Sequence, residues 1–356
     1  MSDTSMQHDA GDPGEPDSGE PPRRGRGRRI RRIALVSAAA VIVVIGAVAG
    51  GGYLFANHIL SSVHRIDVPA LDAPHQPVMP AATRAGMTIL LTSFGAGPAP
   101  KLASSTAGPL PPAGGFIALV HLNANQHAGA VISIPPNAVV RVPGHGRTDI
   151  GNALALGGPS LLIKTVEKLT DVRSNHYSVL SLTGALQVID ALDGITVDVP
   201  YATTSLGHAF HQGINHVNGG TAIAYARQPA VSEIGRELLQ QNLIRSILDK
   251  IAHQHLFNSA VADYRLVRAL AGALSVDSNL SNSGLESLAL HLGKLGAGDG
   301  VFVNAPAAGG SATLGGAAPV HLKRALSQKL WQAIRHDSVA AFAQRYPSTV
   351  TSTAPA

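Results

Sequence analysis

Apolar residues along the chain fall into short runs and helical repeats that alternate with one another. Runs bounded by Gly, Pro or Asn indicate buried strands, whereas apolar residues spaced three or four positions apart indicate helices. The strand candidates are 87–94, 116–123, 128–134, 176–182, 195–200 and, as an edge strand, 301–306. The helix candidates are 159–170, 183–192, 231–254, 259–274 and 284–295, followed by a closing helical region at 321–345. This alternation predicts a layered α/β domain.

Turn and loop signals separate these elements. Asn123–Gln126 is a hairpin connection between the second and third strand candidates, and Asp193-Gly194 is expected to end a helix. Residues 95–115 and 307–318 are rich in Gly and Ala and are expected to be loops. The segment 219–227 is short and apolar.

A stretch of 24 uncharged residues, 33–56, precedes the predicted domain. About 20 apolar residues span a bilayer as a helix, so this stretch is predicted to be a transmembrane helix. Seven arginines between positions 23 and 32 favour a cytoplasmic N-terminus at the cell membrane, which places the main domain outside the cytoplasm. A cleaved signal peptide has the same charge polarity and is the alternative.

The remaining boundaries follow from composition. Residues 1–32 are expected to form a disordered cytoplasmic tail that ends in the arginine run. Residues 57–86 contain four prolines and are interpreted as a stalk. The extracytoplasmic domain is assigned to 87–345 with its core in 87–254, and 346–356 are read as a polar tail.

Composition and charge exclude several kinds of chemistry. The 356 residues are 45% hydrophobic and 14% charged and include no Cys, which excludes disulfide scaffolds, thiol nucleophiles and cysteine-based zinc sites. The net charge of +5 is tied to the arginine run, for which a nucleic-acid arm is one interpretation. The predicted topology keeps the main domain away from nucleic acid, so no such partner is expected. The 16 histidines include no His-Glu-x-x-His pattern, and no protein metal site is assigned.

Several segments resemble LytR-CpsA-Psr (LCP) proteins in the same order and spacing, from about Thr88 to Ile251. They include GAVISIPPN, VRVPGHG, GGTAIAYAR and IGRELLQQ, and the most specific is the run 157–200. The resemblance implies an α/β/α sandwich with a central mixed sheet and a hydrophobic pocket for a polyprenyl chain. It also implies transfer of a glycopolymer from a polyprenyl diphosphate carrier to peptidoglycan, with Mg²⁺ as cofactor.

Most charged residues of the family's motifs are missing from this chain. The family's Asp positions around the first two strands fall in Ser93-Phe94-Gly95 and at Gly115. The family's Ser-Ile-Pro-Arg-Asp reads Ser-Ile-Pro-Pro-Asn at 133–137, which removes one arginine and one carboxylate. The Lys and Asn of a third motif fall at Asp149 and Gly151, and two later arginines fall at Pro229 and Leu239.

The residues that survive carry the site prediction. By resemblance, the phosphate-binding residues are Arg227, Arg236 and Gln240, and the candidate accessory residues are Arg141, Arg147, Asn137 and Asp149. No catalytic residue is assigned. Each candidate also has a structural interpretation. Arg227 could end a strand, and Arg236 could pair with a neighbouring Glu. Arg141 and Arg147 could be solvated loop residues, and Asp149 could cap a turn or a helix.

A preserved scaffold with depleted acids and arginines favours a pseudoenzyme, because each lost preorganised contact costs a factor of about 10²–10³ in rate. The expected protein is membrane-anchored, binds polyprenyl-linked glycopolymer, and assists its attachment to peptidoglycan or modulates an active LCP paralogue. The first alternative is an active Mg²⁺-dependent phosphotransferase that uses Asp149, Asn137 and Arg147. The second is a transcriptional regulator that uses the arginine run.

Overall fold

The structure is a computed structural model in which part of the chain is described. The described residues are 61–74, 76–94, 116–125, 128–199, 201–226, 228, 239, 242–244, 246–247, 250, 260–285, 288, 300–309, 312–313, 316–317 and 320–350. The predicted tail 1–32 and the predicted transmembrane helix 33–56 lie outside these ranges. Within these ranges no helix is both long enough and apolar enough to cross a membrane.

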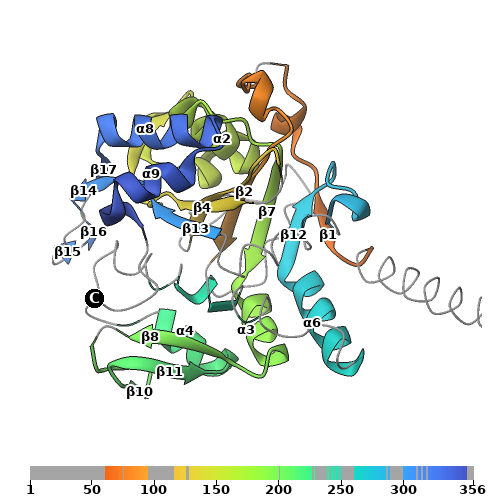
Figure 1. Ribbon diagram of the computed structural model, residues 1–356, viewed down its shortest axis with the longest axis vertical. Coiled ribbons are helices and arrows are strands. Elements are labelled where there is room, and N and C mark those ends of the chain that lie inside the picture. The colour runs from red at the N-terminus through yellow and green to blue at the C-terminus, as the bar shows by residue number, and fades with distance from the viewer. Residues whose placement is uncertain are drawn as a thin grey trace, which may run out of the picture. The chain divides into compact units, whose positions relative to one another are not determined.

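A mixed sheet of seven strands forms the centre of the described chain (Figure 1). Its order is β1 (His64–Ile66), β12 (Leu274–Asp277), β7 (His176–Ser181), β2 (Met87–Phe94), β3 (Phe116–Leu122), β4 (Gly129–Ser133) and β13 (Gly300–Asn304). Strands β2, β3 and β4 pair antiparallel, whereas β2 with β7 and β4 with β13 pair parallel. The predicted strands at 87–94, 116–123, 128–134 and 176–182 are therefore confirmed, and 301–306 is confirmed as an edge strand.

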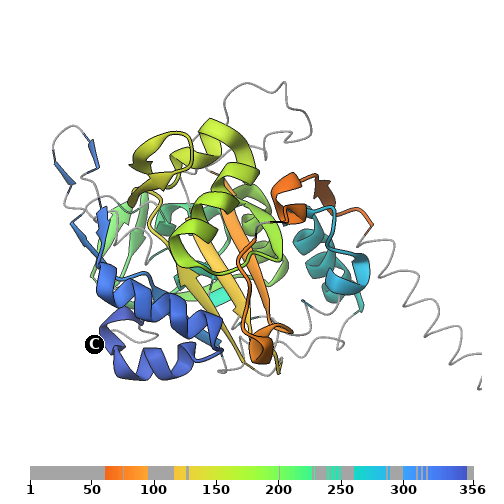
Figure 2. The same cartoon turned by 90° about the horizontal axis from the view of Figure 1, so that it is seen from above.

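Three helices cover one face of this sheet: α2 (Asn152–Thr170), α8 (Arg324–Arg335) and α9 (Val339–Arg345) (Figure 2). Alternate residues of β3, such as Ile117 and Leu119, point into the core beneath them and are fully buried. Helix α2 begins seven residues before the predicted start at Pro159. Its backbone leaves helical geometry at Gly157 and Gly158, so Pro159 opens the second helical piece, where its missing N–H costs nothing.

The other face of the sheet carries its own apolar cluster, which includes Ile89, Phe116, Val120 and Phe302. Residues of α6 (Ala260–Ala273) and of helical stretches near 244 and 285–288 pack on this cluster. Helices on both faces give the expected α/β sandwich with a mixed sheet.

A second, smaller core lies around the two-stranded sheet of β8 (Ile195–Val199) and β11 (Gly213–Val217). Helices α3 (Leu182–Ala191), α4 (Gly219–Ala226) and α6 contribute to it, and β9 (Thr203–Ser205) pairs with β10 (His208–Phe210) beside it. The predicted helix 183–192 ends as expected, because Asp193 and Gly194 both adopt positive φ. The segment 219–226 is helical, so the interpretation of Arg227 as the end of a strand is wrong.

The segment interpreted as a stalk, 57–86, is part of the folded domain from residue 63 onward. Strand β1 joins the sheet beside β12, and short 3₁₀ helices form at Pro69–Asp72 and Ala81–Thr83. Ile66, Val68 and Leu71 are buried in the core under α2. The physical reason is that these apolar residues stand between the prolines, and burying them stabilises the segment against the sheet.

Two further regions differ from expectation. The predicted loop 307–318 contains three short strands, β14 (Ala307–Gly309), β15 (Ala312–Thr313) and β16 (Gly316–Ala317), and β14 pairs with β17 (Val320–Leu322). The first residues of the predicted polar tail form a 3₁₀ turn at Pro347–Thr349, and Val350 bridges to Val303.

Candidate functional site

The carboxyl end of β2 meets the ends of three other strands. Ser93 lies opposite Phe116 at the start of β3, and Ser133 at the end of β4 lies opposite both Ala118 and Asn304. Residues opposite one another in neighbouring strands share a face, so Ser93, Ser133 and Asn304 lie on the face that carries Phe116 and Phe302. This end of the sheet is therefore apolar with polar residues at its rim.

A hairpin rises directly from this end of the sheet. It consists of β5 (Val139–Val142) and β6 (Gly146–Asp149), and its register places Arg141 directly opposite Arg147. Asp149 lies two residues beyond Arg147 and so shares its face. Val140 and Val142 on the opposite face are buried in the main core. Packing of these valines directs Arg141, Arg147 and Asp149 away from the core together.

The two arginines and the aspartate make this face of the hairpin cationic. Both arginine residues are exposed, and like charges directly opposite in a hairpin repel each other unless an anion lies between them. Burial raises the pKa of the Asp149 carboxyl above its usual value. The arrangement suits the binding of an anionic group by two guanidinium groups.

Asn137 is held close to the base of this hairpin. The amide of Gly151, just before α2, donates to the carbonyl of Pro136 at 2.8 Å, and the carbonyl of Asn137 accepts from the amide of Val320 at 3.3 Å. The side chain of Asn152 donates to the Thr148 hydroxyl at 3.0 Å, which ties the start of α2 to β6. The structure thus brings the four accessory candidates, Asn137, Arg141, Arg147 and Asp149, into one region.

The three phosphate-binding candidates cannot be placed in the same way. Arg227, Arg236 and Gln240 lie outside the described residues. Their neighbour Gln228 is described and is only 3% exposed.

Sequence reasoning missed a set of buried polar groups that have no hydrogen-bond partner. In the described part of the chain these are the hydroxyls of Ser133 and Ser174, both amide atoms of Gln228, both carboxylate oxygens of Asp198 on β8 and Nε of Arg335. A buried polar group without a partner costs about 1–3 kcal/mol, so such groups in a native fold call for a ligand or water. The signal in the sequence was weak, because Ser and Gln in apolar surroundings are usually taken as core or loop residues.

Tyr225 connects two of these groups. Its hydroxyl donates to the backbone carbonyl of Asp198 at 3.1 Å, and it lies three residues before Gln228. Burial raises the pKa of Tyr225 to about 12, so its phenol is a neutral hydrogen-bond donor near pH 7. This part of the molecule therefore combines a buried phenol with unpaired carboxylate and amide oxygens.

The described residues do not fit a Mg²⁺ site. Mg²⁺ prefers six oxygen ligands with carboxylates among them, whereas the hairpin offers the single carboxylate of Asp149 beside two arginines. No group of three or more His, Asp or Glu side chains that could hold a metal occurs in the described part of the chain. No step of a reaction is therefore assigned to a metal here.

The sequence matches a model of the LytR_cpsA_psr family over residues 116–294, which is half of the chain. Among curated proteins it is similar to the polyisoprenyl-teichoic acid–peptidoglycan teichoic acid transferase TagU of Bacillus cereus, with 30% identity over 38% of this chain and 46% of that protein. It is also similar to TagU of Bacillus mycoides, with 26% identity over 59% of this chain and 69% of that protein. The chain thus spans about half to two thirds of the length of these relatives.

Solved structures share the fold. A LytR-Csp2A-Psr enzyme from Actinomyces oris superposes with a TM-score of 0.57 at 18% identity, covering 76% of this chain and 95% of that one. TagV of B. subtilis gives a TM-score of 0.56 at 20% identity, covering 72% and 98%. A structure titled TagT bound to LI-WTA gives 0.54 at 20% identity, covering 77% and 99%. At these identities the likeness establishes the α/β architecture.

Proposed function

The chain belongs to the LytR_cpsA_psr family, and on this premise we propose that it binds a polyprenyl diphosphate-linked glycopolymer and assists its attachment to peptidoglycan with little or no catalysis of its own. In this proposal the segment 33–56 anchors the protein in the cell membrane with its N-terminus in the cytoplasm. The domain then works at the outer surface, where both the lipid-linked polymer and the wall are present.

One observation carries the proposal: the sheet end at β2, β3 and β4 holds a buried hydroxyl without a partner, whereas the family's acids are missing there. The Ser133 hydroxyl has no hydrogen-bond partner in the described part of the chain, and Asn137 stands at the position where the family's motif has an aspartate. Neutral hydroxyl and amide groups bind phosphate and sugar oxygens, but they cannot hold a dication or accept a proton as a carboxylate does. This composition supports binding and weakens the case for transfer.

The relatives point to the chemical class of the ligand. The name of TagU describes the transfer of polyisoprenyl-linked teichoic acid to peptidoglycan. A polyprenyl chain would lie between the apolar sheet face of Phe116 and Phe302 and the helices that cover it, and Arg141 and Arg147 of the hairpin on the other face would bind the diphosphate. The glycopolymer itself is left open in this proposal, as is the alternative that the protein assists an active paralogue.

A second candidate is a working transferase, and the hairpin favours it. Arg141, Arg147 and Asp149 share one face, so a guanidinium pair and a carboxylate of raised pKa lie side by side. Such a group could act as the acid or base for an acceptor hydroxyl. The carboxylate would be displaced from the position that the family's motifs use.

The test measures binding and transfer on the same preparation. The full-length protein in detergent is incubated with a radiolabelled polyprenyl diphosphate glycan, peptidoglycan and Mg²⁺. Retained lipid-linked glycan and glycan attached to the wall are counted separately. The variants are Arg147→Gln, Asp149→Asn and Arg227→Ala. The matched control is Arg324→Gln, which changes an exposed arginine at the start of α8.

Saturable retention of the lipid-linked glycan without transfer is the expected result. If Arg147→Gln and Arg227→Ala lose retention while Arg324→Gln retains the ligand as wild type does, the ligand lies at the proposed sheet end. Transfer that requires Asp149 would establish the second candidate instead. Absence of retention by a folded protein would overturn the binding proposal.

A further inference from the structure

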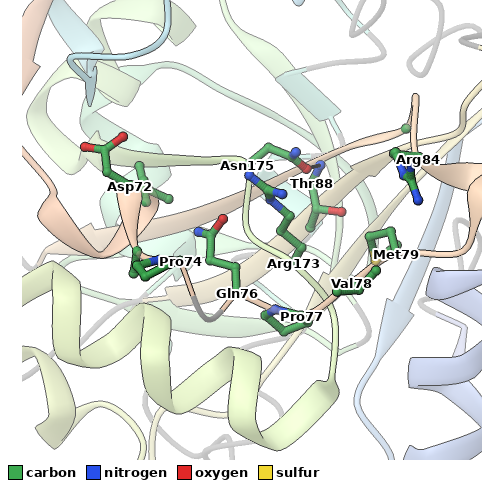
Figure 3. A pocket seen from close by; sticks show the side chains of 13 residues that line it. Asp72, Pro74, Gln76, Pro77, Val78, Met79, Arg84, Thr88, Arg173 and Asn175 are labelled. Atoms are coloured by element: carbon green, nitrogen blue, oxygen red, sulfur yellow. Dashed lines mark hydrogen bonds between the residues drawn. The ribbon is translucent and has the colours of Figure 1, made fainter.

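A cavity of about 600 Å³ lies at the opposite end of β2 from the site described above (Figure 3). Its walls come from residues 71–74 and 76–79, from Arg84 and Gly86 before β2 and Thr88 within it, and from Arg173 and Asn175 between α2 and β7. Thr88 and Ser93 are five residues apart on one strand, which separates the two places by about 17 Å. The cavity is thus distinct from the sheet end that carries Ser133.

Among the described residues, no carboxylate forms an ion pair with Arg84 or Arg173 of this cavity. The ion pairs there join His121 to Asp337, His176 to Asp277 and Arg335 to Asp171. Glu167 is an electrostatic neighbour of Arg173, but one of its oxygens accepts from the Ser174 amide at 2.9 Å. Asp72 lies at the opposite end of the cavity from Arg84, with Arg173 and Asn175 between them (Figure 3). Both guanidinium groups therefore keep donors for a ligand.

The amide side chains add directed hydrogen-bonding groups. Asn175 accepts from the Thr88 amide through Oδ1 at 2.8 Å, which fixes its orientation and leaves its Nδ2 as a donor without a protein partner. Gln76 uses Nε2 to donate to the carbonyls of Ala70 at 3.3 Å and Ser174 at 3.4 Å. Its Oε1 is then an acceptor on the side chain next to Arg173 (Figure 3).

The wall of the cavity is held in place before any ligand binds. Arg335 donates to the carbonyl of Val78 at 3.2 Å, and the Thr83 hydroxyl donates to the carbonyl of Arg335 at 2.6 Å. At Gly86 a Cβ atom would stand 3.0 Å from the carbonyl oxygen of Leu122, so the chain passes close to β3 at this point. A site that is already ordered loses less entropy on binding, which favours recognition.

We propose that this cavity is a second binding site, specific for a phosphate group that carries a neighbouring hydroxyl, as in a polyol or sugar phosphate. Arg173 and Asn175 lie side by side and supply donors for one phosphate, and Arg84 lies further along the cavity, where it adds positive charge (Figure 3). Gln76 Oε1 accepts from the hydroxyl. The phosphate is either part of a polymer or free, and the site does not depend on the function proposed above.

Titration calorimetry measures the binding of each ligand to the full-length protein in detergent. The probes are glycerol 3-phosphate, inorganic phosphate, a short glycerol phosphate oligomer and, as the uncharged control, glycerol. The variants are Arg173→Gln and Arg84→Gln, with Arg324→Gln as the matched exposed control. Arg173→Lys keeps the positive charge but removes the planar guanidinium group. Thermal melting checks that each variant is folded.

Saturable binding of glycerol 3-phosphate that weakens at least tenfold in Arg173→Gln and is unchanged in Arg324→Gln is the expected result. Tighter binding of the oligomer would identify a polymer as the source, and equal binding would identify a small phosphate. Binding that is equal in all variants, or no saturable binding to a folded protein, overturns the proposal. Arg227→Ala leaves this binding unchanged, so failure here and failure of the proposed function are separable.

Discussion

Two buried polar side chains at opposite ends of the central sheet differ in whether the protein itself satisfies them. At the end where β2 begins, His121 is fully buried, and both of its ring nitrogens have partners, Thr88 Oγ1 at 2.9 Å and Asp337 Oδ1 at 2.7 Å. At the end where β4 finishes, the Ser133 hydroxyl is equally buried and has none. The same sheet therefore contains one polar network that is closed within the protein and one polar group that is left open.

This difference separates structural groups from ligand-binding groups. A network whose members satisfy one another stabilises the fold and has no capacity left for a ligand. A buried group without a partner costs stability unless something outside the chain satisfies it.

The closed network also fixes the C-terminal helices to the sheet. Asp337 lies between α8 and α9 in a left-handed conformation and accepts from the Ala124 amide at 2.7 Å as well as from His121. Asn123 of the same turn donates to the backbone carbonyl of Asp337 at 3.4 Å. The hairpin between β3 and β4 is thus tied to the helix pair that closes the main core.

The largest effect is expected from Asp337→Ala. It removes the acceptor from buried His121 and from the Ala124 amide, and each unpaired group costs about 1–3 kcal/mol, so we expect a loss of about 3 kcal/mol in the free energy of unfolding. Urea denaturation measures it, with exposed Asp67→Ala as the control. A loss no larger than that of the control would mean that the network is not closed as the geometry indicates.

A smaller effect is expected in the pH dependence of stability. Burial raises the pKa of Asp337, but the hydrogen bonds from His121 and Ala124 and the attraction of His121 outweigh it, so the pKa lies below its usual value. A carboxyl whose pKa is lowered by folding contributes stability above its unfolded pKa of about 3.9, and this contribution is lost as the pH falls through the folded value.

The reference for this measurement is Asp337→Asn, which tolerates the left-handed backbone and cannot ionise. The difference in unfolding free energy between wild type and Asp337→Asn should be constant from about pH 6 down to about pH 4 and shrink below it. A difference that does not change at acidic pH would show that folding leaves the pKa of Asp337 unshifted.

Much of the sheet could be predicted from the sequence, because most of its strands are recognisable from their own residues alone. Strands such as 87–94 and 116–122 are continuous apolar runs, and buried strands of a sheet covered on both faces have this pattern. Strand β1 was missed because its three residues, with one buried isoleucine, are too few to show the alternation of apolar and polar residues that indicates a strand. Its pairing with β12 also joins residues that are far apart in the chain. Helix α4 was ambiguous because a run of eight mostly apolar residues is too short to distinguish a helix from a strand.

The candidate site was predictable only in part. The register of the hairpin pairs Arg141 with Arg147. That register depends on a turn in which Gly144 and Gly146 both have positive φ, and the two glycines made this turn predictable from the sequence. Ser133 and Gln228 could not be singled out, because the absence of a partner is a property of the packed structure. The cavity at Arg173 was hidden for a similar reason, since its wall comes from a segment interpreted as a stalk.

The smallest effect on stability, and the sharpest contrast, is expected from Ser133→Ala. Its hydroxyl has no partner to lose, so the unfolding free energy should stay within about 0.5 kcal/mol of wild type. Tyr177→Phe is the matched contrast, because it removes a buried hydroxyl that is bonded to Thr92 at 2.9 Å and should cost about 1 kcal/mol. Ligand binding provides the second readout. If the Ser133 hydroxyl contacts the lipid-linked glycan, Ser133→Ala weakens retention of that ligand about fivefold, because one hydrogen bond is lost. Tyr177→Phe leaves the retention unchanged. A Ser133→Ala variant that loses as much stability as Tyr177→Phe would remove the distinction between a buried hydroxyl that has a partner and one that has none.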